Sequence, residues 1–308
     1  MNIEIIGAKG QTGTIFEESF RHVPDTLITA SDRKTLKKDL ERQGTGLIIA
    51  ANRNPVTDVL QTIRDTAGDG SVVVLTQNGI EAPEIARTIL SGRTIDVIAG
   101  SLITTATRED TGLVTYNANK LRVGLAAVMG PSVDSSLTTT SHLFKKAGFE
   151  TQILPDYQEM LWTKLFVNMI NFSAIEHRLP PAKAFKNQEI FNQELNAMIT
   201  RLHILHAAGI KLVNLPGIPG ILMDKGLNFP LTPAILGPLK GLLADWLQAE
   251  RGGSLPAAAR DMQAGKPTEA RYYLKPWIDL GQRASIPSPL DEHLLQVVER
   301  YESNLNAS

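Results

Sequence analysis

The sequence contains no cysteine. Disulfide bonds, thiolate catalysis and cysteine-ligated metal centres are therefore excluded, although this absence does not identify the compartment. The 308 residues also lack an apolar run of about 18 residues, which a membrane helix needs. The first residues show no basic segment followed by a long apolar stretch. We therefore expect a soluble cytoplasmic protein without a membrane partner.

An excess of charge of either sign is missing as well. The chain has 31 Lys and Arg against 32 Asp and Glu, which gives a formal net charge of −1. Such a balance offers no electrostatic footprint for a nucleic acid. We expect a small-molecule substrate as the partner. The oligomeric state stays open, with a homodimer as one option.

The pattern of residue types changes near residue 155. Before it, short β-branched runs alternate with helical patterns, which predicts a parallel sheet with crossover helices. After it, the patterns are helical and are interrupted by loops rich in Pro and Gly. We predict an α/β protein with a parallel-sheet domain at 1–155 and an all-helical domain at 156–308. Strands are expected at 3–6, 27–30, 47–51, 72–76 and 96–99, and a hairpin from 113–116 and 120–125 near the sheet edge.

A glycine-rich turn directly follows the first expected strand. Gly7, Gly10 and Gly13 are spaced G-x-x-G-x-x-G, and a short amphipathic helical pattern comes next. Glycines at such a turn let the backbone approach a pyrophosphate, whose charge the N–H groups of the helix start can bind. A plain tight turn is the alternative, since the commonest fingerprint has glycine where Lys9 stands. We interpret the turn as a dinucleotide site.

The second expected strand leads into Ser31-Asp32-Arg33. An acidic residue there favours a free ribose 2′-hydroxyl, whereas Ser31 and Arg33 suit a 2′-phosphate. The residues by themselves leave both cofactors open. Because Arg53 adds further positive charge, we predict that NADP(H) is preferred, with Asp32 as the evidence against it.

Residues 161–175 form an almost wholly apolar helical pattern with one narrow polar stripe. Lys164, Asn168 and Asn171 lie within about 60° of arc at about 100° per residue. The stripe could simply face water, but the apolar residues on both flanks favour a cleft. A partly desolvated lysine in a cleft can protonate a developing alkoxide. That chemistry needs a hydride or electron donor, which the glycine turn would hold.

Several motifs together resemble the ketopantoate reductase family. They are the glycine turn, Gln77-Asn78-Gly79, the stretch AGSLITTATREDTGLV at 99–114, WTKLFVN at 162–168 and AGKPTE at 264–269. Their order and spacing span nearly the whole chain. The resemblance implies an N-terminal Rossmann-type domain, an all-helical C-terminal domain and a substrate cleft between them. It also implies NADPH-dependent reduction of a 2-oxo acid to a 2-hydroxy acid, in pantothenate biosynthesis.

The resemblance further implies roles for individual residues. Lys164 matches the general acid that protonates the ketone oxygen, and Glu269 matches the carboxylate that holds the substrate and orders the lysine. Asn168 matches a substrate contact, and Asn78 matches a cofactor contact near the nicotinamide. A helix-start position favours an acidic residue in any case, so Glu269 also has a purely structural interpretation.

Some positions depart from the family pattern. Asn52 stands where the family has a cofactor-contacting lysine, and Asn171 lies one residue before the family's second polar position. Ala257 replaces a substrate-binding serine, and Ser254 is the hydroxyl that could take over its contact. We keep Asn52 as a cofactor-binding candidate, and Asn171 and Ser254 as substrate-binding candidates. We expect a preference for 2-oxo acids less polar than ketopantoate.

Two other functions stay open. The β-hydroxyacid dehydrogenases also have a Lys and an Asn four residues apart, although Glu269 and the motif at 77–79 favour the first interpretation. A regulator that binds NADP without turnover would also suit the glycine spacing. Metal chemistry is not expected, because His203 and His206 lie three residues apart without a third ligand in register.

Overall fold

The computed structural model describes residues 1–32, 34–51, 55–104, 106–108, 114–116, 121–228, 238, 240–245 and 255–307. The chain divides into two compact units. Unit 1 comprises Met1–Leu161 and Leu215–Ile218, and unit 2 comprises Trp162–Asn214 and Pro219–Ser308. The division falls inside helix α6 (Tyr157–Asn168), whereas the sequence predicts a domain boundary just before this helix.

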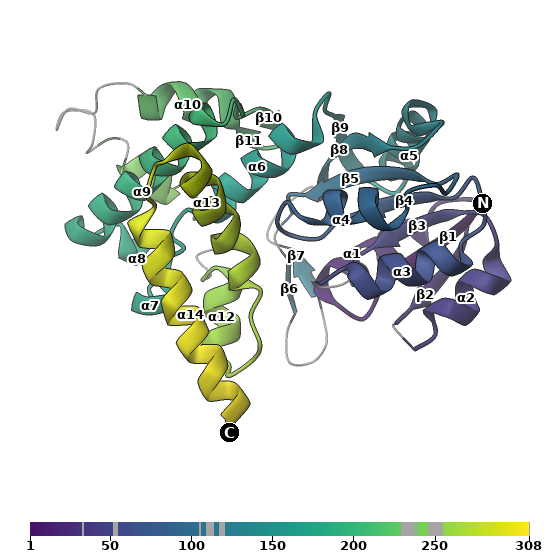
Figure 1. Cartoon of the computed structure of the whole chain (residues 1–308), viewed down its shortest axis with the longest axis horizontal. Helices are drawn as coiled ribbons and strands as arrows, with labels where there is room; N and C mark the ends of the chain where they lie inside the picture. Colours follow the sequence, from purple (N-terminus) through teal and green to yellow (C-terminus); the bar gives the residue numbers. More distant parts are fainter. Residues whose placement is uncertain are drawn as a thin grey trace. The chain divides into compact units, whose positions relative to one another are not determined.

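Unit 1 is built on a seven-stranded sheet in the order β2-β1-β3-β4-β5-β8-β9 (Figure 1). The strands are β1 (Asn2–Ile6), β2 (Leu27–Ser31), β3 (Leu47–Ala50), β4 (Val72–Leu75), β5 (Asp96–Leu102), β8 (Leu121–Met129) and β9 (Phe149–Ile153). The first five pair in parallel, which confirms the predicted parallel sheet and its strands between residues 3 and 99. Strand β8 pairs antiparallel with β5 and parallel with β9.

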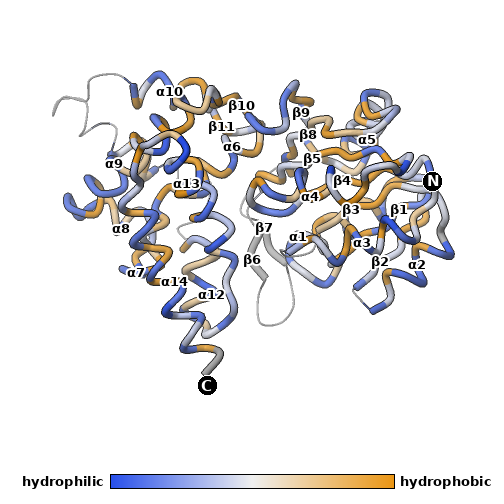
Figure 2. The backbone as a smooth tube through the Cα atoms, in the orientation of Figure 1, coloured by the Kyte–Doolittle hydropathy of each residue, from blue (hydrophilic) through white to orange (hydrophobic). Residues whose placement is uncertain are grey.

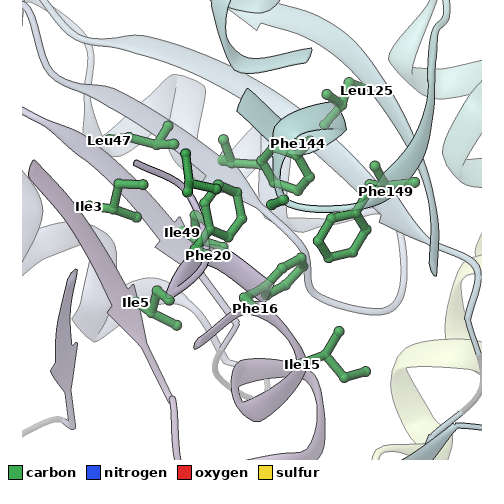
Figure 3. Close-up of a cluster of buried hydrophobic side chains, with 14 of the residues drawn as sticks. Ile3, Ile5, Ile15, Phe16, Phe20, Leu47, Ile49, Leu125, Phe144 and Phe149 are labelled. Atoms are coloured by element: carbon green, nitrogen blue, oxygen red, sulfur yellow. The ribbon is translucent and has the colours of Figure 1, made fainter. Parts of the chain in front are cut away.

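Both faces of this sheet are buried, which explains the nearly continuous apolar runs of its strands. The covering helices are α1 (Gln11–Phe20), α2 (Leu36–Gln43), α3 (Thr57–Thr66), α4 (Ala82–Ile89) and α5 (Val133–Lys146). Figure 2 shows hydrophobic residues concentrated along the central strands. On the face that carries Ile3 and Ile5, Phe20 of α1 meets Phe144 of α5 with ring centroids 5.0 Å apart (Figure 3). This cluster fixes α1, and therefore the turn before it, on the sheet.

The predicted hairpin near the sheet edge is wrong. Strand β7 (Val114–Tyr116) pairs antiparallel with β6 (Ala106–Arg108) in a separate two-stranded sheet. Its expected partner is instead part of β8, which lies between β5 and β9 in the main sheet. The residues 117–119 of the expected turn lie outside the described residues. Strand β8 buries Val123, Leu125 and Ala126 completely, as is typical of a strand inside a sheet that is covered on both faces.

Unit 2 is mainly helical, which confirms the predicted change of architecture. Its helices, besides the later part of α6, are α7 (Ala174–His177), α8 (Pro181–Ala184), α9 (Gln188–Ala207), α10 (Gly220–Asn228), α12 (Ala257–Gln263), α13 (Ala270–Ala284) and α14 (Pro289–Ala307). A short pair of strands, β10 (Asn214–Leu215) and β11 (Ile218–Pro219), follows α9 and includes the segment Leu215–Ile218 of unit 1. Among the described helices, none combines the length and apolar character that a bilayer crossing requires.

The predicted helix over 161–175 is wrong beyond Asn168. Helix α6 ends there, and turns lead to α7 at Ala174. Asn171 adopts a φ of 61°, which interrupts the helical path. Its backbone N–H donates to the carboxylate of Glu194 on α9 at 3.1 Å, and the N–H of Ser173 donates to the same carboxylate at 2.9 Å. A buried carboxylate from another helix thus accepts these two backbone N–H groups, an interaction that the local pattern does not reveal.

Candidate cofactor and substrate site

The parallel strands of unit 1 bring the predicted cofactor residues to one edge of the sheet. Gly7 follows β1, Ser31 ends β2, and Asn78 follows β4. The strand order reverses at β1, and dinucleotides bind beyond the carboxyl ends of strands at such a switch point. Three further candidates, Arg33, Asn52 and Ser254, lie outside the described residues.

The glycine turn packs tightly against the start of α1. Gly7 adopts a φ of 79°, and the N–H of Gly10 donates to the Gly7 carbonyl at 2.8 Å. A Cβ on Gly13 would lie 2.1 Å from the Gly7 oxygen, so only glycine lets α1 pack this closely on the turn. Gly10 is the N-cap of α1 and supplies no side-chain cap, and the first turn of this helix has no acidic residue. Its first N–H groups therefore suit an incoming anion.

At the end of β2, Ser31 turns away from this edge. Its side chain is 2% exposed, and its hydroxyl donates to Asp39 of α2 at 2.6 Å. This geometry does not favour the predicted contact between Ser31 and a 2′-phosphate. Asp32, the next residue, faces the glycine turn instead, since its carboxylate pairs with Lys9 at 3.4 Å.

Sequence reasoning missed a buried carboxylic acid beside Ser31. Glu4 of β1 is fully buried, and this burial raises its pKa to about 7. A hydrogen bond with Ser31 and the charge of Arg42 act in the opposite direction, while the nearby charge of Asp39 adds to the increase. The only signal was a charged residue within the apolar run NIEII.

The end of β4 is anchored to its neighbour β3. The hydroxyl of Thr76 and the side-chain amide of Gln77 donate to the Ala50 carbonyl at 2.8 and 3.0 Å. Gly79 adopts a φ of 95°, and the chain turns at this point with Asn78 exposed. Gln77 therefore positions the turn that carries Asn78. The sequence identified the motif but not this anchoring role.

Of the three residues of the predicted polar stripe, only Lys164 and Asn168 lie on α6. Both are half-buried, whereas every other residue from Met160 to Ile170 is buried. Asn171 leaves the stripe: it is 0% exposed, and its side-chain amide donates to the Leu179 carbonyl at 3.4 Å. The prediction that Asn171 shares a polar face with Lys164 is wrong for this reason.

Glu269 directly precedes α13, a helix whose Trp277 contacts α6. The Trp277 ring of α13 meets the rings of Trp162 and Phe166 on α6, with centroids 4.9 and 6.3 Å apart. Glu269 is the N-cap of α13, and its carbonyl accepts the N–H of Tyr272 at 2.9 Å. It therefore occupies the helix-start position considered above, and its role towards a substrate stays a prediction. Ala257 is the exposed first residue of α12.

The histidines of α9 form no metal centre with their described neighbours. His206 approaches Asp224 at 3.1 Å on the surface. In the part of the chain that the structure describes, no three side chains of the types His, Asp and Glu are grouped in a way that could hold a metal ion.

Comparisons with known proteins identify the family. The family model described as ketopantoate reductase PanE/ApbA matches residues 3–127, and the model of its C-terminal part matches residues 156–302. Together the two models account for most of the chain. A sequence comparison with curated proteins finds no match.

Solved structures share the fold at low sequence identity. A PanE/ApbA family ketopantoate reductase from Ralstonia eutropha JMP134 is 17% identical, with 99% of this chain and 100% of that chain covered and a TM-score of 0.73. A 2-dehydropantoate 2-reductase from Geobacter metallireducens GS-15 is 15% identical, with 97% of this chain and 99% of that chain covered and a TM-score of 0.73. D-mandelate dehydrogenase in complex with NADH is 15% identical, with 99% of this chain and 100% of that chain covered and a TM-score of 0.73. Since both family models match in order, the chain belongs to the ketopantoate reductase family, whose members are oxidoreductases that bind nicotinamide cofactors.

Proposed function

We propose that this protein reduces a 2-oxo acid to a 2-hydroxy acid at the expense of a reduced nicotinamide cofactor. The observation that carries the proposal is the pair Lys164 and Asn168, one helical turn apart and half-buried on an otherwise buried stretch of α6. An ammonium group on such a half-buried face is partly shielded from competing water. Its electrostatic effect on a reacting oxygen is correspondingly strong.

The glycine turn is the part of unit 1 that would hold the cofactor. The backbone at Gly7, Gly10 and Gly13 would bind the pyrophosphate, with the first N–H groups of α1 as donors. Asn78, held at the end of β4, would contact the cofactor towards the nicotinamide. When bound, the reduced nicotinamide supplies a hydride for the carbonyl carbon.

The residues of unit 2 would handle the substrate and the proton. As the carbonyl carbon gains the hydride, negative charge develops on its oxygen, and the Lys164 ammonium donates a proton there. Lys164 then regains a proton from water, so that one proton is consumed in each turnover. Asn168 would hydrogen-bond the substrate, and Glu269 would hold the substrate and orient Lys164.

The proposed substrate class is inferred from Ala257, which stands where the family has a substrate-binding serine. A hydrogen bond lost to a neutral group costs about 0.5–1.5 kcal/mol, and one lost to a charged group about 1.5–3 kcal/mol. Ketopantoate carries a hydroxyl that an alanine cannot bind, so a less polar 2-oxo acid is the proposed substrate. The shared fold with D-mandelate dehydrogenase supports the inclusion of aryl 2-oxo acids in the test.

Either NADPH or NADH could supply the hydride for the proposed reaction. The prediction of NADPH rested on Ser31, Arg33 and Arg53. The hydroxyl of Ser31 is bound to Asp39, and the two arginines lie outside the described residues. Among the described residues at the end of β2, Asp32 is the one whose side chain faces the glycine turn.

The test is a spectrophotometric screen of cofactor oxidation with ketopantoate, branched 2-oxo acids and aryl 2-oxo acids. On an accepted substrate, Lys164→Ala should lower kcat by about 10²–10⁴-fold, because a positioned proton donor is lost, while cofactor binding persists. The matched control is Lys211→Ala, which removes an exposed lysine of the same unit and should leave kcat within about twofold. Ala257→Ser should shift the preference towards ketopantoate.

Near wild-type turnover in Lys164→Ala would show that the stripe on α6 is structural. Cofactor binding without oxidation by any 2-oxo acid would favour the regulator. Oxidation of 3-hydroxy acids in preference to 2-hydroxy acids would favour the β-hydroxyacid dehydrogenase alternative.

A further inference from the structure

The carboxyl end of β2 presents one side chain inward and the next one towards the glycine turn. Ser31 points into unit 1, where it donates to Asp39 and hydrogen-bonds Glu4. Successive side chains of an extended chain point to opposite sides, so Asp32 points the other way. Its Oδ2 lies 3.4 Å from the Nζ of Lys9, which belongs to the glycine turn. In a dinucleotide site of this kind, the adenosine ribose lies between these two segments.

The Asp32 carboxylate is held in place and held ionised. Its Oδ1 accepts the backbone N–H groups of Lys34 and Thr35 at 2.9 and 3.2 Å, which closes a turn directly after β2. These two hydrogen bonds, followed by the interaction with Lys9, keep the pKa of Asp32 below its usual range. The side chain is therefore oriented by two backbone hydrogen bonds, and it carries a full negative charge at neutral pH.

A fixed carboxylate distinguishes the two nicotinamide cofactors by hydrogen-bond chemistry. An ionised carboxylate only accepts hydrogen bonds, and a ribose 2′-hydroxyl has a proton to donate to it. A 2′-phosphate at neutral pH carries a charge of about −1.5 to −2 and chiefly accepts. Placed beside Asp32, it would be repelled by the negative charge and would receive no hydrogen bond from that carboxylate.

From this geometry we propose that Asp32 makes NADH the preferred cofactor, with Oδ2 accepting from the ribose hydroxyls. The proposal rests on the proposed function, because it assigns the ribose of that same cofactor. It differs from the preference for NADPH that the sequence analysis drew from Ser31, Arg33 and Arg53.

Lys9 does not reverse this selection. Its side chain is 88% exposed, so its pair with Asp32 is a weak, solvent-screened one. A 2′-phosphate could attract Lys9, but the ammonium would then leave Asp32 uncompensated beside the new charge. A ribose hydroxyl can be accepted while the pair between Lys9 and Asp32 stays in place.

The experiment measures the dissociation constants of NADH and NADPH without substrate, by titration of cofactor fluorescence. Asp32→Asn keeps the oxygen that closes the turn and replaces the accepting Oδ2 by a donating amide. The matched control is Asp69→Asn, which makes the same change of charge at an exposed carboxylate. Asp69 lies just before β4, at the amino ends of the parallel strands and not at their carboxyl ends. We expect the wild type to bind NADH at least about tenfold more tightly than NADPH. The ratio should move towards NADPH by about 10- to 150-fold in Asp32→Asn, and by less than about twofold in Asp69→Asn.

A wild type that binds NADPH as tightly as NADH, or more tightly, would overturn the proposal whatever the variants do. An unchanged ratio in Asp32→Asn, or an equal shift in Asp69→Asn, would overturn it as well. Binding of neither cofactor would instead overturn the proposed function on which it rests, so the two failures are distinguishable.

Discussion

Glu4 is a carboxylic acid enclosed within a strand of the central sheet, and its titration couples protonation to folding. Its pKa is about 7 in the folded protein, mainly because of burial, against 4.5 for the unperturbed group. Below pH 4.5 it is protonated in both states and does not change the free energy of unfolding. Between these values the unfolded chain loses the proton and the folded chain keeps it, so stability decreases as the pH rises.

We predict that Glu4→Gln removes this part of the pH dependence. A displacement of about 2.5 pKa units corresponds to about 3 kcal/mol of unfolding free energy, fully lost only above about pH 7. The variant should match the wild type near pH 4.5 and exceed its stability by up to about 3 kcal/mol at pH 8. Urea unfolding followed by far-UV circular dichroism at both pH values measures the difference.

Asp39→Asn serves as a comparison, because it removes a smaller contribution to the pKa of Glu4 and leaves burial unchanged. It should reduce the pH dependence only in part. A constant difference between Glu4→Gln and the wild type across the whole pH range would contradict the assignment.

At the scale of elements, the turn between α6 and α7 depends on one buried side chain. Glu194 is 1% exposed and accepts the N–H groups of Asn171 and Ser173 together with the Ser173 hydroxyl. Each buried donor left unpaired costs about 1–3 kcal/mol. The turn follows directly on Asn168, so its position affects the end of the proposed substrate face.

We predict that Glu194→Ala destabilises unit 2 by at least about 2 kcal/mol, since at least two buried N–H groups lose their acceptor. Gln193→Ala, at the neighbouring exposed position of α9, should change stability by less than about 0.5 kcal/mol. Urea unfolding followed by tryptophan fluorescence gives both values. Equal effects of the two substitutions would show that the turn does not need its carboxylate.

The elements that the sequence predicted correctly are those whose signal is local. The strands from β1 to β5 are short, apolar and β-branched, and the glycine turn follows β1 directly. The extension of α6 to residue 175 was wrong because the acceptor that ends it comes from α9, 23 positions further along the chain. The hairpin was wrong because β7 pairs with β6, which directly precedes it, whereas β8 pairs with β5 and β9 in the main sheet.

At the scale of the whole molecule, each unit has its own buried core. Unit 1 has the cluster around Phe20 and Phe144, and unit 2 has the aromatic contacts of Trp277. Chains of two domains commonly depart from two-state unfolding. The sequence contains three tryptophans, Trp162, Trp246 and Trp277, and all three fall within the residue ranges of unit 2.

We therefore predict that urea unfolding gives different midpoints by tryptophan fluorescence and by far-UV circular dichroism. Fluorescence should follow unit 2 alone, whereas circular dichroism averages both units. Coincident transitions with equal slopes would show instead that the two units unfold as one cooperative body.

The candidate site could be predicted from the sequence only where a motif carried it. The glycine turn and Lys164 were recognisable because their chemistry depends on residue type and on spacing along one element. The orientation of Ser31 was not, because it depends on Asp39 of α2 and on Glu4 of β1. Which of two adjacent side chains faces a ligand is a property of the folded strand end.

The contact between Trp162 and Trp277 has an optical consequence. Two indole rings with centroids 4.9 Å apart and planes inclined at 68° have coupled electronic transitions, which give a paired positive and negative signal in circular dichroism. One ring lies on the helix that carries Lys164, and the other lies on the helix that begins after Glu269. Any movement of α6 against α13 would change the coupling, so the chain contains its own label-free reporter of the elements that carry its proposed proton donor and carboxylate.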